Sequence, residues 1–131
     1  MKYLYQTKTE KIIQAFYKVY NTLGYGFLEK VYQNALIIEL RAMGFECKTN
    51  YPIRVFYESF SVGDYFAAII IDDCIIIENK AIETLVDDNV FQLINYLKAT
   101  NIEVGLLLNF GKKPEFKRKI FTNDRKRIEL E

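Results

Sequence analysis

Two apolar segments near the middle of the chain predict the centre of a β-sheet. Residues 65–71 and 74–80 are rich in β-branched and aromatic side chains, and Asp72-Asp73 between them predicts a tight turn. Both segments are apolar on both faces, which is typical of strands that are covered on both sides. We therefore expect a hairpin at the centre of the sheet.

Apolar positions at helical spacing predict three helices. The first begins at residues 7–10, which have the Thr-x-x-Glu form of a capping box, and runs to residue 23. The second spans about residues 28–43 and is bounded by glycines. The third spans residues 87–100, with acids near its start and a lysine near its end, an arrangement that complements the helix dipole.

The remaining strands are predicted from shorter patterns. Residues 45–50 and 53–57 favour strands that are separated at Tyr51-Pro52, and residues 58–64 favour a polar hairpin loop. Residues 104–109 form a continuous apolar run of strand length. Because a helix separates this run from residues 74–80, we expect these two strands to be parallel.

The end of the chain is polar and basic. Residues 116–121 favour a short edge strand, and residues 125–131 are expected to be mobile. The whole pattern predicts one domain over residues 1–131, with a core at about 10–111 and a basic C-terminal extension at 112–131. The element order predicts an α/β or α+β fold with a central mixed sheet flanked by helices.

Composition narrows the chemistry. The chain has no histidine, which excludes histidine bases and histidine metal sites, and its two cysteines lack the spacing of a zinc site. Nothing in the sequence suggests a secretory leader or a stretch of about 20 apolar residues, so we expect a cytoplasmic protein without a membrane partner. The net charge is only +1, but residues 111–131 contain eight basic and four acidic residues.

The second central strand ends in Glu78-Asn79-Lys80. Because side chains alternate along a strand, Glu78 and Lys80 leave the same face, about 6–7 Å apart. An isolated pair of this kind is commonly a strand end that has reached solvent. Carboxylate and lysine chemistry is the alternative.

Two helices offer further candidates. Glu29 lies at the start of the second helix with Tyr32 one turn later, and Gln92 and Tyr96 lie one turn apart on the third helix. Taken alone, Glu29 is a favourable acid in a first helical turn, and the Gln92–Tyr96 pair is an ordinary surface pair.

Together these segments resemble a known family. The segments GFLEKVY, ENKA, FQLINYLKAT and VGLLLNFG are similar, in order and spacing, to the motifs of the GxxExxY proteins, a branch of the PD-(D/E)XK nuclease-like superfamily. The resemblance extends from about Glu10 to Gly111 and implies a restriction-endonuclease-like core.

The resemblance also implies roles for four residues. Glu78 is then a direct ligand of Mg²⁺ or Mn²⁺, and Glu29 completes the metal site. Lys80 orients the attacking water or stabilises the developing charge, and Gln92 contacts a phosphate or supports the site. Such a site agrees with the preference of Mg²⁺ for a few carboxylates and waters, and with the need of phosphodiester cleavage for a metal.

One departure from the family pattern affects the metal site. The family carries an aspartate ten residues before the glutamate, and this chain has Ala68 there, while Phe66 replaces an arginine. Asp64 and Asp72 share the parity of Ala68 but lie about 13 Å away along an extended strand, too far to substitute without a bulge.

Three functions follow as hypotheses. The first is a degenerate, catalytically impaired nuclease-like domain that is kept for nucleic-acid or protein binding. The second is an active or weakened metal-dependent nuclease that cleaves phosphodiester bonds with Glu78 and Lys80. The third is a structural homodimerisation domain, which the ten tyrosines and ten phenylalanines favour.

DNA or RNA is the expected partner under the first two hypotheses. The predicted contacts are basic side chains near the C-terminus: Lys112, Lys113, Lys117, Arg118 and Lys119. A solvated tail is the alternative explanation for these charges.

Overall fold

The computed structural model describes residues 4–128, which form three helices around one sheet. The helices are α1 (Gln6–Leu23), α2 (Glu29–Ala42) and α3 (Asp87–Lys98), followed near the C-terminus by a short 3-10 helix, η1 (Asn123–Arg125). The strands are β1 (Cys47–Tyr57), β2 (Phe60–Ile71), β3 (Ile75–Lys80), β4 (Val104–Phe110) and β5 (Pro114–Ile120). None of the described helices combines the length and apolarity that a membrane crossing requires.

The strands form one mixed sheet in the order β1-β2-β3-β4-β5. Among these strands only β3 and β4 pair in parallel, and the other neighbours are antiparallel. The predicted α/β class, the central mixed sheet flanked by helices and the parallel pair are therefore confirmed.

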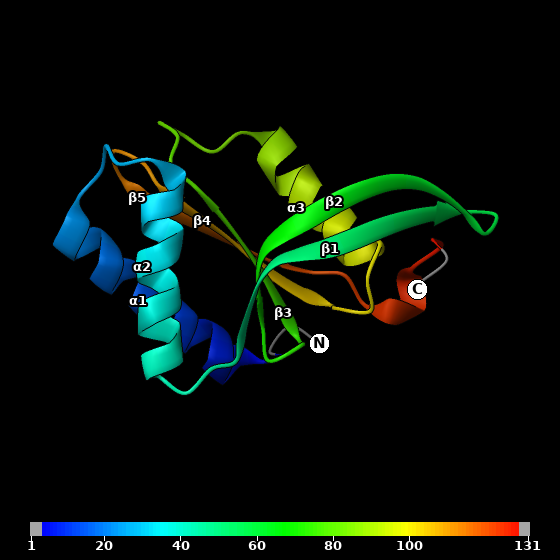
Figure 1. Ribbon diagram of the computed structural model, residues 1–131, viewed down its shortest axis with the longest axis horizontal. Coiled ribbons are helices and arrows are strands. Elements are labelled where there is room, and N and C mark those ends of the chain that lie inside the picture. Colours follow the sequence, from blue (N-terminus) through cyan, green and yellow to red (C-terminus); the bar gives the residue numbers. More distant parts are fainter. Residues whose placement is uncertain (1–3, 129–131) are drawn as a thin grey trace.

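The sheet separates two hydrophobic cores. Helices α1 and α2 cover one face and α3 covers the other (Figure 1). Along β3 the alternation of side chains supplies both cores, because Ile75 and Ile77 pack under α1 and α2 whereas Ile76 packs under α3. This explains why the strand is apolar on both faces.

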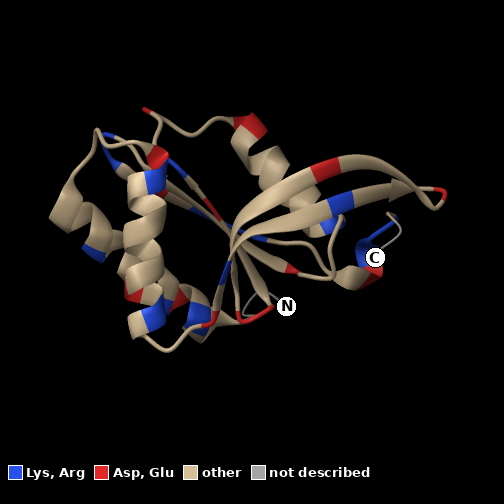
Figure 2. Cartoon of the chain, in the orientation of Figure 1, with Lys and Arg blue, Asp and Glu red and all other residues tan. Residues whose placement is uncertain are grey.

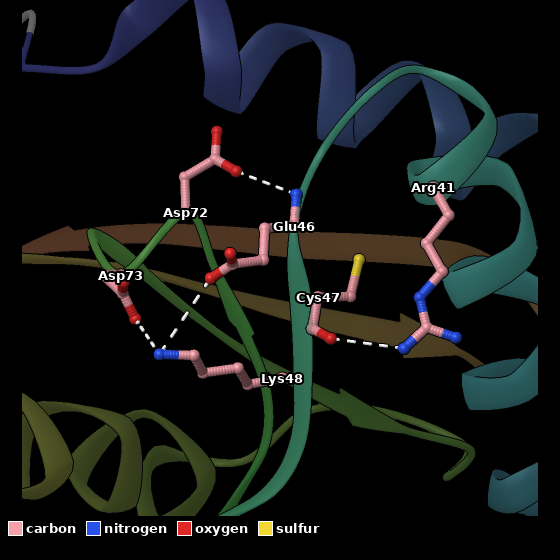
Figure 3. Close-up of polar contacts among 6 residues, drawn as sticks. All are labelled: Arg41, Glu46, Cys47, Lys48, Asp72 and Asp73. Carbon is pink, nitrogen blue, oxygen red and sulfur yellow. Dashed lines mark hydrogen bonds and ion pairs between the residues drawn. The ribbon is translucent and has the colours of Figure 1, made fainter.

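The tight turn between β2 and β3 is confirmed at Asp72 and Asp73, whose φ angles are 49° and 56°. The Asp72 carboxylate accepts hydrogen bonds from Lys8 Nζ on α1, at 2.6 Å, and from the backbone N–H of Glu46, at 2.8 Å. Lys48 pairs with Asp73 at 2.6 Å (Figure 3). The turn thus ties α1 and the start of β1 to the central hairpin.

The predicted capping box is wrong. Helix α1 begins at Gln6, so Thr7 lies inside its first turn, and the residue at the N-cap is Tyr5 in a left-handed conformation without a side-chain cap. Thr9 Oγ1 donates to the backbone carbonyl of Gln6 instead, at 3.0 Å. Glu10, the acid of the predicted motif, accepts from Gln6 Nε2 at 3.0 Å, so it does not bond to the backbone N–H of a capping residue.

The predicted break at Tyr51-Pro52 is also wrong, because β1 is one continuous strand. Strand β1 lies at the edge of the sheet, where a proline costs no ladder hydrogen bond if its nitrogen faces away from the neighbouring strand. Asn50, just before Tyr51-Pro52, has a left-handed φ of 48° within the continuous strand.

The predicted hairpin loop at residues 58–64 shrinks to a turn at Glu58 and Ser59, whose φ angles are 48° and 71°. Strand β2 already begins at Phe60. The far part of the β1–β2 hairpin extends beyond the body of the molecule (Figure 1). Neither face of this part is buried, so its polar side chains do not mark a loop.

The predicted edge strand near residues 116–121 is present as β5, and the chain beyond it is anchored as far as residue 128. Lys126 Nζ donates to the backbone carbonyls of Thr100 and Ile102, at 2.7 and 2.8 Å. The expectation of a mobile end is therefore corrected for residues 125–128. Residues 129–131 lie outside the described part of the chain.

Candidate functional site

The end of β3 directs two charged side chains toward α3. Ile76 packs in the core under α3, and Glu78 and Lys80 follow it at spacings of two and four residues, on the same face of the strand. Glu78 is only 9% exposed, whereas Lys80 is half-buried. The pair is therefore a partly buried feature of the sheet and not a solvated strand end.

The carboxyl of Glu78 is strongly perturbed. Burial raises its pKa from 4.5 to about 7, and the charge of Glu29 adds to this rise, while Lys80 and the backbone N–H of Ala68 oppose it. Its Oε1 atom is buried and has no hydrogen-bond partner in the described residues. The carboxyl therefore titrates near neutral pH, and one of its oxygens lacks a partner.

Helix α2 starts against this strand. The backbone carbonyl of Glu29 accepts a hydrogen bond from Asn79 Nδ2, at 3.2 Å. One turn later Gln33 Nε2 donates to the backbone carbonyl of Ala68, also at 3.2 Å. These two amides place the start of α2, and with it Glu29, at the same end of the sheet as Glu78.

The loop before α2 is held by Tyr32. Its ring stacks on Phe110 with centroids 4.4 Å apart, and its hydroxyl donates to the carbonyl of Gly24 at 2.6 Å and accepts from the N–H of Phe27 at 3.2 Å. Gly26 has a φ of 112°, which other residues rarely adopt. The glycine and tyrosine of the GFLEKVY segment therefore fix the position of the acid between them.

Gln92 and Tyr96 lie on the other side of the site. Gln92 Nε2 donates to Tyr96 Oη at 2.6 Å, from an exposed position to a buried ring. The pKa of Tyr96 is raised, mainly by burial and in smaller part by the negative charge of Glu78. Glu78 and Gln92 are thus neighbours through the tyrosine.

The connection from Lys80 to α3 is fixed by residues that the sequence analysis missed. Asn109, fully buried on β4, accepts from the N–H of Ile82 at 3.0 Å and donates to its carbonyl at 2.9 Å. Glu115 accepts from Asn109 Nδ2 at 3.2 Å. A Cβ at Gly111 would lie 2.3 Å from the carbonyl of Ile82, so only glycine fits. The one polar residue inside the apolar run 104–109 was the available signal.

Asn79 was missed as well, although it stands between the two predicted site residues of β3. The alternation that sends Glu78 and Lys80 toward α3 sends Asn79 toward α2, where it is fully buried and contacts Glu29. A buried amide at this position could have been predicted from the apolar neighbours of the motif.

Ala68 stands where the family pattern has an aspartate. The backbone N–H of Ala68 donates a hydrogen bond to the Glu78 carboxyl, so the two residues are neighbours at the end of the β2–β3 pair, which is in register as far as Ile69 and Ile77. Among residues 4–128, no three His, Cys, Asp or Glu side chains are arranged to hold a metal ion. The site thus contains four charged or polar side chains, those of Glu78, Lys80, Glu29 and Gln92. Ala68, at the position of the family aspartate, contributes only a methyl group.

These residues fit a weakly held divalent cation. The unpartnered oxygen of Glu78 would supply one ligand and Glu29, whose charge acts on Glu78, would supply a second, since Mg²⁺ is commonly held by one or two carboxylates with waters in the other positions. When bound, such a cation lowers the pKa of a coordinated water and neutralises charge on a phosphate.

The five basic residues predicted to contact nucleic acid do not form one surface. The alternation of β5 separates Arg118 from Lys117 and Lys119. Arg118 points to α1, where its Nε donates to Thr9 Oγ1 at 3.3 Å and its guanidinium also donates to the carbonyl of Leu4. We therefore leave Arg118 out of the predicted nucleic-acid surface.

The other four lysines lie along β5 and the turn before it. Lys112, Lys113 and Lys117 are exposed and Lys119 is half-buried. Lys112 lies 3.4 Å from Glu83 of the connection before α3. Figure 2 shows the connection before α3 and the basic turn on the same side of the molecule, and Glu83 balances part of the basic charge there.

Comparison with known proteins gives one match. The family model of the PD-(D/E)XK nuclease superfamily matches residues 6–119, which is most of the chain. The match includes all four segments that carry the resemblance, and the five-stranded mixed sheet with helices on both faces is consistent with a restriction-endonuclease-like core. We found no match among curated proteins and none among solved structures. The narrower GxxExxY assignment stays a prediction.

Proposed function

Because the chain belongs to the PD-(D/E)XK nuclease superfamily, we propose that it is a nuclease-like nucleic-acid-binding domain with strongly reduced cleavage of phosphodiester bonds. One observation carries this proposal: the residue whose backbone N–H bonds to the Glu78 carboxyl is Ala68, and its side chain supplies no third anionic ligand. With two carboxylates instead of three, a divalent cation is bound weakly and the charge of the transition state is poorly neutralised.

The residues that remain favour the binding of a phosphate. Lys80 is a half-buried ammonium next to Glu78 and attracts the negative charge of a phosphodiester. The amide of Gln92 extends from α3 on the same side of the sheet. A backbone phosphate placed between them receives a positive charge and a hydrogen-bond donor.

A weakened nuclease is the second candidate. The buried, unpartnered Oε1 of Glu78 favours it, because buried polar atoms normally have a partner and a cation would supply one. A cation would also favour the ionised form of a carboxyl whose pKa is about 7.

Titration calorimetry with Mg²⁺ and Mn²⁺ separates the two candidates. We expect weak or undetectable binding to the native chain and tighter binding to Ala68→Asp, and Glu78→Gln should abolish binding in both backgrounds. Cleavage of single- and double-stranded DNA and RNA, assayed with the same cations, should rise in Ala68→Asp. Tight cation binding by the native chain, with cleavage that Glu78→Gln abolishes, would establish the weakened nuclease instead.

Nucleic-acid binding is tested by its dependence on salt. Each lysine that neutralises a phosphate contributes about 0.9 to the slope of log affinity against log salt for duplex DNA. We expect Lys117→Ala to reduce this slope by about one, whereas Lys18→Ala on the opposite helical layer should leave it unchanged. A chain that binds no nucleic acid at low ionic strength would refute the proposed function.

A further inference from the structure

A cleft lies between α3 and the β1–β2 hairpin, next to the candidate site. Its volume is about 430 Å³, and it is lined by the rings of Tyr65, Phe91 and Tyr96 and by the amides of Gln92 and Asn95. No role in the proposed chemistry has been assigned to it. The hydrogen-bonded pair Gln92 and Tyr96 belongs to both the cleft and the candidate site, because it lies between the cleft and Glu78.

The cleft presents aromatic faces to solvent. Tyr65 is 48% exposed and Phe91 is 57% exposed, although both line a concave surface. The ring of Tyr65 lies 5.8 Å from the buried ring of Tyr96, which keeps Tyr65 in place. Exposed aromatic rings in a concave site mark a binding surface, since an apolar surface of this kind is usually covered by a ligand.

Polar side chains with unused hydrogen-bonding groups lie beside the rings. Asp88 and Asn95 both line the cleft, and neither side chain forms a hydrogen bond or ion pair with any other described residue. A side-chain amide pairs with the donor and acceptor edge of a base, and a carboxylate accepts from an exocyclic amino group. Flat rings next to such groups suit a flat heterocycle with a polar edge better than an aliphatic side chain.

We propose that this cleft binds an unpaired nucleobase adjacent to the phosphate held at Lys80 and Gln92. The inference rests on the proposed nucleic-acid binding and specifies its substrate class. A base inside a duplex is stacked and paired and does not reach a cleft lined by rings, whereas a base of a single strand or a frayed end does. The domain is therefore selective for single-stranded nucleic acid or strand ends.

Fluorescence anisotropy with labelled oligonucleotides tests the proposal. The probes are a mixed-sequence single strand, as DNA and as RNA, the corresponding duplex, and a single strand in which a run of bases is replaced by abasic sites. The protein is the native chain, Phe91→Ala and Phe91→Leu. Phe60→Ala is the matched control, because Phe60 is a 73% exposed phenylalanine on the β1–β2 hairpin and does not line the cleft.

We expect the native chain to bind the single strand more tightly than the duplex. Phe91→Ala should weaken single-strand binding about tenfold, equivalent to about 1.4 kcal/mol, which is within the range for one base stacked on one ring. Phe91→Leu should weaken it similarly, since leucine keeps apolar area but has no stacking face. The abasic strand should lose the same factor and should not respond to Phe91→Ala.

Each of the following results would overturn the inference. Equal affinity for single strand and duplex would remove the selectivity, and full affinity in Phe91→Leu would show apolar contact without stacking. A free nucleoside monophosphate that binds as tightly as the oligonucleotide would assign the cleft to small nucleotides. If salt-dependent binding persists while the Phe91 variants are neutral, only this inference fails. If no oligonucleotide binds at low salt, the proposed function fails with it.

Discussion

Glu78→Gln isolates the cost of burying an ionisable group at the end of β3. The substitution keeps the size and shape of the side chain, replaces one carboxyl oxygen by an NH2 group and removes the ionisable proton. Glu78 is 9% exposed, and burial raises its pKa from 4.5 to about 7, despite the opposing charge of Lys80. Its ionised form is therefore less stable in the folded protein than in the unfolded chain.

The sign and size of the effect follow from proton linkage. Between pH 4.5 and about 7 the folded protein keeps a proton that the unfolded chain has released, so the free energy of unfolding falls as the pH rises. The fall amounts to about 1.4 kcal/mol for each pH unit. Over the whole interval it reaches about 3 kcal/mol, with little further change above pH 8. The glutamine variant lacks this contribution.

Urea denaturation followed by circular dichroism between pH 4 and pH 8 measures the effect. We expect the stability of Glu78→Gln relative to the native chain to increase by about 3 kcal/mol from pH 4 to pH 8. Glu58→Gln, at the exposed tip of the β1–β2 hairpin, controls for the loss of a carboxylate from the surface. An identical pH dependence in Glu78→Gln and the native chain would refute the reasoning, as would a variant that is relatively less stable at pH 8.

Three further substitutions test how the site is held. Gly111→Ala places a Cβ 2.3 Å from a backbone carbonyl of the connection before α3, and thermal unfolding should show that the free energy of unfolding falls by about 1–3 kcal/mol. An unchanged melting temperature would contradict the close approach. Tyr32→Phe removes the hydrogen bond to the carbonyl of Gly24 at 2.6 Å, and we expect the free energy of unfolding to fall by about 1 kcal/mol. Introduced into Ala68→Asp, the same substitution should weaken cation binding, and an unaffected cation affinity would argue against a positioning role of Tyr32. Asp72→Asn weakens the contact with Lys8, which together with a backbone N–H lowers the pKa of Asp72 although burial opposes this. Because the pKa of Asp72 in the folded protein lies below 3.8, the ionised carboxylate stabilises the fold above that pH, and this stabilisation disappears on acidification. We expect Asp72→Asn to lower the free energy of unfolding by up to about 1 kcal/mol at pH 7 and not at pH 2, and an equal decrease at both pH values would refute the ionic origin.

The amino-acid sequence was sufficient for the elements that are buried or strongly periodic. The three helices and the strands on either side of Asp72-Asp73 were predicted because their apolar side chains follow the period of the structure that buries them. The alternation that puts Glu78 and Lys80 on one face is a local property of any strand. These features depend only on residues that are close in sequence.

The wrong predictions concern strand segments in which burial imposes no regular pattern of apolar side chains on the sequence. Strand β1 was divided at Pro52 because a proline argues against a strand, and only the sheet order shows that β1 is an edge strand that tolerates it. The hairpin beyond Val55 is exposed on both faces, so polarity there indicated a loop. In both cases the deciding information was the position of the strand within the sheet.

The site itself shows the same division. Sequence motifs selected Glu29, Glu78, Lys80 and Gln92, but not the contacts that arrange them. The hydrogen bond from Asn79 to Glu29 joins residues 50 positions apart, and the clamp formed by Asn109 spans 27.

What the sequence alone determined is therefore the identity of the chemical groups and the local geometry of each element. Only the tertiary structure determined that the Glu78 carboxyl is buried, that Arg118 is turned toward α1, and that Tyr65 and Phe91 face one cleft. The physical reason is that the burial and the electrostatic environment of a side chain depend on packing between segments that are distant in sequence. The periodicity of apolar residues within one segment does not specify which other segments it contacts.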